Sequence, residues 1–393
     1  MEHYQYLIVG GGMTADAAVR GIRELDSAGS IGLVSAEGVG PYDRPPLSKG
    51  LWKEKDLESI WRQTADIANV TLHLRTTAAQ LDVEERSITD GHGNLYAYEE
   101  LLLATGGSPR RLPFGGESII YFRTLDDYRR LRALTETGDR FAVIGGGFIG
   151  SEIAAALAMN GKHVTMIFPE TGVAAPTFPA DLSQSVTQLY REKGVEVLNG
   201  KTVEGVNEDG NHLVLHVSGN QSITVDAVVA GIGITPNVDL AKAANLNVSN
   251  GIVVDELLQA SAPHIYAAGD VANFFNPALN KRLRVEHEDN ANTMGRLAGR
   301  NMAGAGERYT HLPFFYSDLF ELGYEAVGEI DARLQTVSRW KEPYREGIVY
   351  YLRAGTLRGV LLWNVWEKVE RARALISEGH TFTLAELDSA IPL

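Results

Sequence analysis

Apolar residues in this chain are grouped into short runs, which are separated by glycine-rich turns and by segments with helical spacing. The run at 6–9 leads into a turn at 10–15, a helix pattern follows to about Leu25, and a second run at 31–34 ends near Glu37. Short apolar runs predict strands, and apolar residues spaced by three and four predict a helix. The order therefore predicts a strand, a turn, a helix and a second strand.

The same order recurs at domain-sized spacing. The run at 141–144 is followed by Gly145, Gly147 and Gly150, which form the pattern G-x-G-x-x-G, then by an alanine-rich helix pattern and by a strand that ends near Glu170. Such glycines let the backbone turn tightly and approach a pyrophosphate, whose charge lies at the start of the helix. An acid about twenty residues further on is suited to a ribose hydroxyl. The repeat predicts two bound dinucleotides.

Between the repeats, the segment 40–49 is stiffened by Pro45 and Pro46 and carries the cations Arg44 and Lys49. Alone it is typical of a surface loop, but beside a dinucleotide site its cations are suited to phosphate or a flavin ring. Ser48 is expected to cap a short helix. Further strands are predicted at 71–74, 79–82, 87–89, 95–98, 101–105 and 228–230, and a helix at 126–137.

The last part of the chain predicts a return to the first domain and then a third domain. A small-residue strand ends in Gly269 and Asp270, where it offers a carboxylate or an ordinary turn residue, and a helix is predicted at 288–302. Beyond 312, strands at 347–352 and 357–363 and a helix at 365–378 predict an α+β fold. The predicted fold is thus α/β with two Rossmann-like domains, the second inserted in the first. The expected domains are 1–120 with 248–308, 121–247, and 309–393.

Composition excludes several kinds of reaction and partner. The chain has 393 residues, of which 44% are apolar and 22% charged, and no apolar run approaches a membrane span. It has no cysteine, so disulfide and dithiol chemistry are excluded and redox chemistry requires a bound cofactor. A net charge of −14 argues against nucleic acid as a partner. The first strand starts almost at Met1, which leaves no room for a signal peptide and predicts a cytoplasmic protein.

Five further motifs give a more specific resemblance: RPPLSK at 44–49, VEH at 285–287, FYSD at 315–318, GYE at 323–325 and GVLLWN at 359–364. With the two glycine turns, ATGG at 104–107 and AGD at 268–270, the chain resembles flavoproteins of the glutathione-reductase fold. Within that group it is most similar to apoptosis-inducing factor and bacterial ferredoxin reductases. The resemblance covers nearly the whole chain.

The resemblance implies the site residues. FAD is expected on Gly10, Gly12, Ala15, Glu37, Arg44, Lys49, Ala79, Thr105, Gly106, Arg123, Asp270, Glu286, His287 and Tyr316. NADH is expected on Gly145, Gly147, Phe148, Ile149, Gly150, Glu152, Glu170, Gly233 and Glu325. The residues implied in catalysis are Lys49, Glu152, His287 and Tyr316, and no metal is expected. Lys49 and Glu152 would pair beside the flavin, and Phe148 would gate the nicotinamide pocket. An acid in the first turn of a helix is also favoured by the helix dipole alone, and Tyr316 is also compatible with a core aromatic residue.

Several positions depart from the family pattern. Ala36 stands where many relatives carry the ribose-binding acid, so Glu37 must reach from the next position. Tyr316 stands where apoptosis-inducing factor usually has a tryptophan, and in this it resembles monodehydroascorbate reductases. Asn292, however, stands where those reductases use an arginine. Pro176 replaces a basic residue that contacts NAD. The long insertion of animal apoptosis-inducing factors near 337–348 is missing.

The implied reaction passes hydride from NADH to FAD and electrons on to an acceptor. Glu170 favours NADH because a carboxylate repels a 2′-phosphate. Three alternatives remain open: reduction of a ferredoxin-like carrier, reduction of a small molecule, and a redox-sensing protein that forms a long-lived reduced complex and changes its oligomeric state. Both monomer and homodimer are compatible with the sequence. A carrier would dock on the cations Lys281, Arg282, Arg284, Arg296 and Arg300.

Overall fold

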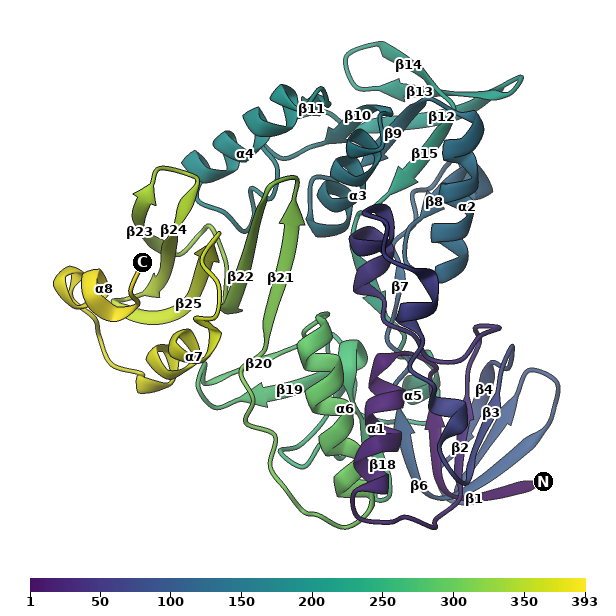
Figure 1. The fold of residues 1–393 in the computed structure, drawn as a ribbon. Coiled ribbons are helices and arrows are strands. Elements are labelled where there is room, and N and C mark those ends of the chain that lie inside the picture. The colour runs from purple at the N-terminus through teal and green to yellow at the C-terminus, as the bar shows by residue number, and fades with distance from the viewer. The chain divides into compact units, whose positions relative to one another are not determined.

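The computed structural model describes residues 1–393, which divide into two compact units. Unit 1 comprises residues 1–43, 56–108 and 235–313, and unit 2 comprises residues 44–55, 109–234 and 314–393. Unit 1 contains a sheet with a parallel core and two antiparallel strands at one end, and unit 2 contains a parallel sheet and an antiparallel sheet, with helices beside them (Figure 1). The predicted α/β architecture with an α+β C-terminal part is confirmed, whereas the predicted boundaries of three domains stay a prediction.

A seven-stranded sheet forms the centre of unit 1. In order of pairing its strands are β3 (Val70–His73), β2 (Ile31–Val34), β1 (Glu2–Val9), β6 (Leu95–Leu103), β5 (Ser87–Asp90) and β4 (Ala78–Asp82), with β18 (Ile265–Ala267) paired to β6. The sequence predicted two strands where the structure has the single strand β6. No turn residue interrupts this stretch, and its register with β1 runs on from Tyr96 to Leu103.

The parallel strands of unit 1 end level with one another. Val9 lies opposite both Val34 and Leu103, and Leu103 lies opposite Ala267. The four turns that follow β1, β2, β6 and β18 therefore leave from one edge of the sheet, where ligands bind in open α/β sheets.

Two helices, α1 (Met13–Arg23) and α6 (Glu288–Met302), lie side by side in unit 1 (Figure 1). A side chain at Gly21 or Gly299 would collide with the backbone of the other helix, so glycine is what allows the close approach. The smaller elements of the unit, and the two strands that link it to unit 2, are α5 (Asp239–Ala243), β17 (Ile252–Val253), β19 (Ala272–Asn276), β20 (Lys281–Leu283), η3 (Leu57–Ile60), η4 (Thr64–Asp66), η6 (Gly269–Val271), β7 (Gly107–Pro109) and β16 (Ile234–Pro236).

Unit 2 repeats the parallel sheet with five strands. In order of pairing they are β11 (Glu196–Asn199), β10 (His163–Phe168), β9 (Arg140–Ile144), β15 (Ala227–Ala230) and β8 (Ile119–Tyr121). Ile144 lies opposite Ile167 and Ala230, so these strands also end at a common edge. The accompanying elements are α2 (Leu125–Thr137), α3 (Phe148–Met159), α4 (Ala180–Glu192), η5 (Gly116–Ser118) and the small sheet of β12 (Val203–Asp209), β13 (His212–Val217) and β14 (Gln221–Val225).

The segment 44–55 belongs to unit 2 and forms two short 3-10 helices, η1 (Pro45–Ser48) and η2 (Gly50–Trp52). The Trp52 ring packs edge-on against Tyr128 of α2, with ring centres 5.7 Å apart, and the Arg132 guanidinium lies over it at 5.3 Å. The Asn160 amide also donates to the Trp52 carbonyl at 3.2 Å. These contacts hold the segment against α2 and the end of α3.

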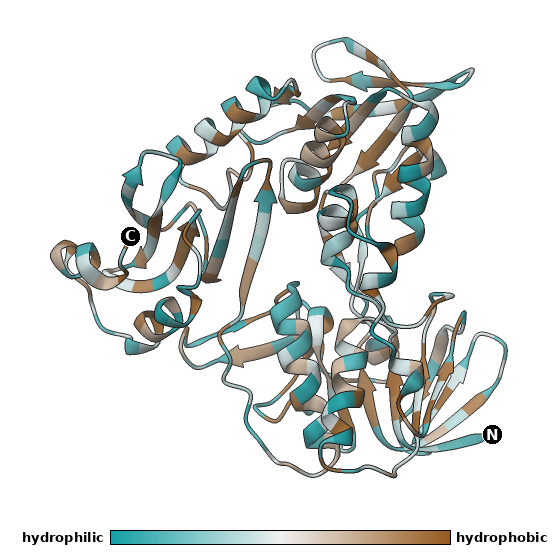
Figure 2. Ribbon diagram, in the orientation of Figure 1, coloured by the Kyte–Doolittle hydropathy of each residue, from teal (hydrophilic) through white to brown (hydrophobic).

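The C-terminal sheet of unit 2 is antiparallel. In order of pairing its strands are β21 (Phe314–Leu319), β22 (Leu322–Gly328), β25 (Thr356–Trp363), β24 (Glu346–Arg353) and β23 (Gln335–Glu342), followed by the helices α7 (Val369–Glu378) and α8 (Leu384–Ala390). Apolar residues run along β24 and β25 (Figure 2). The helix predicted from 365 begins only at Val369, because Glu367 has a positive φ angle of 62°, which a right-handed helix does not admit.

Candidate functional site

The first glycine turn of unit 1 has the geometry of a phosphate-binding turn. Gly10 has a φ of 130°, and a side chain there would collide with the Ala104 carbonyl. Gly12 is the N-cap of α1 and no side chain caps that helix, while Ala15 is buried in its first turn. Backbone N–H groups at an uncapped helix start are suited to an anion. The structure thus brings together the three residues that the sequence predicted here.

The neighbouring turns of unit 1 hold the next predicted residues. The Glu37 carboxylate accepts a hydrogen bond of 2.7 Å from the Tyr42 hydroxyl. The Thr105 hydroxyl donates to the Asn237 carbonyl at 2.7 Å, and the Asn237 amide donates back to the Thr105 carbonyl at 2.9 Å. Gly106 follows with a φ of 61°. Sequence reasoning missed Asn237, whose only signal is its place after Pro236 in a turn.

The remaining predicted residues of unit 1 lie at three places. Asp270 lies in the η6 turn at the shared edge of the sheet, and His287 is the N-cap of α6. Glu286 pairs with Arg284 at 2.7 Å. Ala79 is exposed on β4, the outermost strand of the sheet and three strands from β1 in the pairing order.

The second glycine turn, in unit 2, repeats the first. Gly145 has a φ of 116°, and a side chain at Gly150 would collide with the Gly145 carbonyl. Gly147 is the N-cap of α3 without a side-chain cap, and nothing lies within 4 Å of the position that its side chain would take. This open space lets a ligand approach the backbone. Ile149, the next residue but one, is 37% exposed.

The other residues predicted to hold NADH lie close to this turn. Gly233 follows β15 with a φ of 89°. Glu170 follows β10, and its carbonyl accepts a hydrogen bond of 2.9 Å from the Gly200 N–H. The Phe148 ring packs edge-on against Phe315 of β21, with ring centres 5.0 Å apart.

Glu152 of α3 is the centre of a buried polar cluster in unit 2. Its side chain is only 3% exposed and pairs with Lys49 at 2.8 Å. The Ser48 hydroxyl donates to Oε2 at 2.5 Å, and the Ser317 hydroxyl donates to Oε1 at 2.6 Å. Burying a carboxylate is costly unless a counter-charge and hydrogen-bond donors accompany it. The predicted pair of Lys49 and Glu152 is therefore present.

Sequence reasoning missed the two serines. Ser48 was expected to cap a helix, but it is the last residue of η1 and gives its proton to Glu152 instead. Ser317 comes from β21, far along the chain. Nothing in the local sequence of either serine signals the shared carboxylate, because the three residues meet only through the tertiary fold.

Tyr316 and Glu325 lie directly opposite each other on β21 and β22. Tyr316 is 36% exposed, and the Lys49 ammonium lies 5.2 Å from the centre of its ring. Burial raises the pKa of the Glu325 carboxyl group, an effect that a hydrogen bond from the Glu367 backbone partly offsets. One oxygen of Glu325 is buried and receives no hydrogen bond from the protein. Such an oxygen is suited to a ligand N–H donor.

Arg44 and Arg123 are brought together in unit 2. An Arg44 nitrogen donates to the Arg123 carbonyl at 3.1 Å, and the Arg123 N–H is bound by Asp127 at 3.1 Å. Asp127 also completes a capping box with Thr124 at the start of α2. The Arg44 side chain is thus held against the backbone of Arg123.

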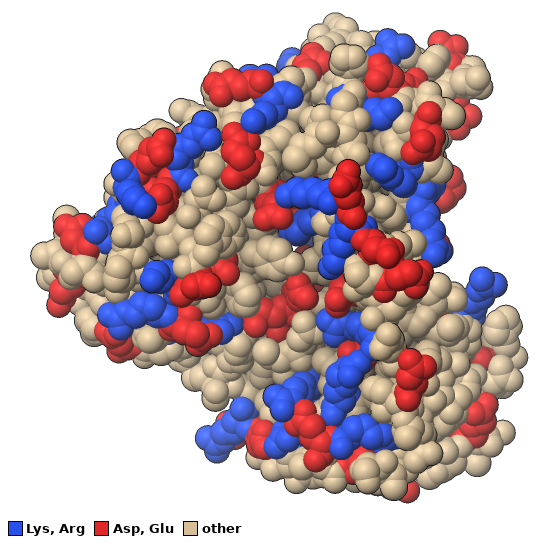
Figure 3. Space-filling view, in the orientation of Figure 1, with Lys and Arg blue, Asp and Glu red and all other residues tan.

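The basic patch predicted for a carrier is only partly exposed. In the region of α1 and α6, cationic and anionic side chains lie next to one another (Figure 3). Arg296 and Arg300 both pair with Glu24. The prediction is wrong for Arg284, whose side chain is only 9% exposed. Its guanidinium is engaged inside unit 1.

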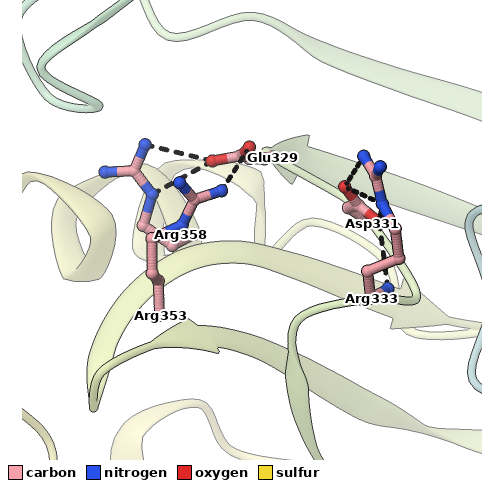
Figure 4. A network of polar contacts seen from close by, with 5 residues as sticks. All are labelled: Glu329, Asp331, Arg333, Arg353 and Arg358. Carbon is pink, nitrogen blue, oxygen red and sulfur yellow. Dashed lines mark hydrogen bonds and ion pairs between the residues drawn. The ribbon is translucent and has the colours of Figure 1, made fainter.

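A second charged network lies in the C-terminal sheet (Figure 4). Glu329 accepts hydrogen bonds from Arg358 at 3.0 Å and from Arg353 at 3.1 Å, and Asp331 holds Arg333 at 2.6 Å. Each arginine therefore has a carboxylate partner within the sheet or its turns. Two of the three arginines share the single carboxylate of Glu329, so the network joins the turn after β22 to strands β24 and β25.

These features define a class of protein. In each unit a parallel strand leads into a glycine turn, and the helix that follows begins without a side-chain cap. Two such turns fit two dinucleotides. The chain has no cysteine, so a redox reaction at these sites cannot use a disulfide of the protein. This combination is typical of a flavoprotein oxidoreductase that uses a pyridine nucleotide. No helix is long and apolar enough to cross a membrane.

The comparisons with known proteins define the family. Residues 4–295 match the pyridine nucleotide-disulphide oxidoreductase family, and residues 298–343 and 338–378 match the C-terminal domain of mitochondrion-associated apoptosis-inducing factor. The chain belongs to this oxidoreductase family, as the resemblance predicted. Membership of this family supports the assignment of the chain as an FAD-dependent oxidoreductase.

Individual relatives lie in both predicted branches. Apoptosis-inducing factor 1 of Dictyostelium discoideum is 34% identical over 435 residues, which cover 100% of this chain and 82% of that protein. The ferredoxin reductase subunit of a 5,5'-dehydrodivanillate O-demethylase from Sphingobium sp. is 34% identical over 389 residues, covering 96% and 94%. Putidaredoxin reductase in its covalent complex with putidaredoxin superposes with a TM-score of 0.91 at 30% identity, covering 98% and 95%.

Proposed function

We propose that this chain is an NADH-dependent FAD oxidoreductase that passes electrons to a ferredoxin-like carrier. The observation that carries the proposal is the pair of glycine turns, each at the common edge of a parallel sheet, in a chain without cysteine. FAD would occupy the sheet edge of unit 1, where Gly10 and Gly12 lie in the glycine turn and Asp270 lies in the η6 turn. NADH would occupy the sheet edge of unit 2, where Gly145 and Gly147 lie in the glycine turn and Glu170 follows β10.

When bound, the flavin accepts a hydride and releases electrons singly, and the protein supplies binding and electrostatics. The first turns of α1 and α3 would bind the pyrophosphates through their N–H groups. Glu325 offers a buried oxygen to an amide N–H donor of the nicotinamide end. The Lys49 ammonium, held by Glu152, is a fixed positive charge that would favour an anionic reduced cofactor.

The choice of NADH over NADPH rests on Glu170. The residue follows β10, at the place where a ribose-binding acid is expected, and a carboxylate there repels a 2′-phosphate. The next cation along the chain is Arg191, which donates to the side chain of Asn199 at 2.8 Å. The Arg191 guanidinium is thus engaged with β11.

The choice of a protein carrier is supported by the relatives that are named ferredoxin reductases. The exposed cations Lys281 and Arg296 remain suited to an acidic carrier. The second candidate is a redox-sensing role, which is favoured by the match to the C-terminal domain of apoptosis-inducing factor. The turn between β23 and β24 is short, however, and offers no long insertion for regulation.

Anaerobic stopped-flow mixing with NADH, followed by exposure to a [2Fe–2S] ferredoxin, a quinone or oxygen, tests the proposal. We expect bleaching of the flavin by NADH and fastest reoxidation by the ferredoxin. Fastest reoxidation by quinone or oxygen would favour a small-molecule acceptor. A long-lived reduced complex with a changed sedimentation coefficient would favour redox sensing, and the absence of flavin reduction by NADH would refute all three.

A further inference from the structure

Arg284, directly after β20, contacts three other residues of unit 1. One guanidinium nitrogen donates to the Asp270 carbonyl at 3.1 Å and forms an ion pair of 2.7 Å with Glu286. Nε donates to the side chain of Asn250 at 3.3 Å. With 9% of its side chain exposed, this is a buried cation whose charge Glu286 balances. Sequence analysis had assigned it to a surface patch.

One partner of Arg284, Asp270, lies at the edge of the sheet at which the first glycine turn lies. Asp270 follows Gly269, which has a φ of 75° and lies against Thr14 in the first turn of α1. The backbone of the η6 turn is thus fixed between the start of α1 on one side and Arg284 on the other. Glu286 immediately precedes His287, the N-cap of α6.

The geometry requires an arginine. A guanidinium has several N–H donors in one rigid plane, so it can bind a carboxylate and a carbonyl at the same time. A lysine offers a compact, strongly hydrated charge on a flexible stem, and it cannot keep the same partners in place. An Arg284→Lys substitution therefore keeps the charge and removes the positioning.

We propose that Arg284 is a positioning residue of the flavin site, which holds the η6 turn and Glu286 in the conformation that binds FAD. The proposal rests on the proposed function, because it assigns FAD to the turn of unit 1. Arg284 does not itself touch the cofactor. It acts through Asp270 and Glu286, and it is not part of a docking surface for a carrier.

Arg282 provides a matched control. It lies two residues earlier, on β20, and one of its nitrogens donates to the carbonyls of Val254 and Asn273, both at 3.0 Å. It thus also holds backbone carbonyls of unit 1, but it contacts neither Asp270 nor Glu286. Arg282→Lys tests the general cost of replacing an arginine in this region.

The test is titration of the apoprotein with FAD, followed by flavin fluorescence, in the absence of NADH and carrier. We expect Arg284→Lys to raise the Kd for FAD about tenfold or more, since it loses a charge-assisted hydrogen bond, and Arg282→Lys to change it less than about twofold. The melting temperature of the Arg284→Lys apoprotein should match that of Arg282→Lys. A merely structural role of Arg284 would instead weaken FAD binding and lower the melting temperature together.

A second variant keeps the proposal falsifiable. Glu286→Gln should also raise the Kd for FAD, and combining it with Arg284→Lys should add little, because both act through one ion pair. If wild-type apoprotein binds FAD but Arg284→Lys binds it equally well, the positioning role is wrong. If wild-type apoprotein does not bind FAD, the proposed function itself fails.

Discussion

Replacing Lys49 with methionine should destabilise unit 2 markedly, because it leaves the Glu152 carboxylate buried without its cation. The two side chains are 12% and 3% exposed, and their ion pair measures 2.8 Å. Removing one partner of a buried pair costs about 3–5 kcal/mol. Ser48 and Ser317 still donate to the carboxylate, so we expect a loss near the lower end, about 3 kcal/mol.

Lys53→Met is the matched control. Lys53 is four residues further along the same segment, and it pairs with Asp318 at 3.5 Å, with side chains 42% and 39% exposed. Exposed pairs contribute about 0–1 kcal/mol, since water screens both charges. The same chemical change should therefore have a much smaller effect.

Urea unfolding of the apoprotein, followed by tryptophan fluorescence, measures both losses. Of the 5 tryptophans only Trp61 lies in unit 1, so the signal reports mainly on unit 2. The free energy of unfolding lost in the double variant Lys49→Met/Glu152→Gln should be smaller than the sum of the two single losses, by about 1 kcal/mol or more. Equal losses in Lys49→Met and Lys53→Met, or strictly additive effects in the cycle, would refute the reasoning.

Three further outcomes follow from the site. Burial raises the pKa of the Glu325 carboxyl from its ordinary value of 4.5, so the stability that this group contributes below pH 4.5 is lost as pH rises through the raised pKa. Glu325→Gln should therefore have a higher melting temperature than wild type at neutral pH, and an equal gain near pH 4 would contradict this assignment. Glu170→Ala should lower the KM for NADPH about tenfold and raise that for NADH, and an unchanged ratio would show that another group selects the nucleotide. Lys281→Glu should raise the KM for a ferredoxin at low salt, with the difference fading in high salt, and equal values at low salt would place the carrier elsewhere.

The glycine turns and the strands beside them were accessible from sequence, because their signals are local. A short apolar run before glycine fixes a strand end, and parallel strands in register bring those ends to one edge. The helix at 288–302 was predicted with its observed ends. The late start of α7 was missed because Glu367 fits a helical pattern but adopts a positive φ angle in the fold.

The supporting residues of the site were not accessible in the same way. Ser317, Asn237 and Arg284 act through partners that are distant in the chain or lie in other turns. Neither their residue types nor their spacing distinguishes them from surface polar residues. Arg284 in particular was grouped with exposed cations by sequence proximity alone, and its burial follows only from the packing of the η6 turn.

Helix α3 and strand β21 contact each other at two places, which connects the C-terminal sheet to the proposed nucleotide site. Phe148 and Glu152 are four residues apart on the helix, which is a rise of about 6 Å, and their partners Phe315 and Ser317 are two residues apart on the strand, a rise of about 7 Å. Because the two rises are nearly equal, both contacts form at once, and a shift of the strand by one residue would break both. The start of α3, where NADH is proposed to bind, is thus held in register by β21, whose residues fall within the stretch that matches the C-terminal domain of apoptosis-inducing factor.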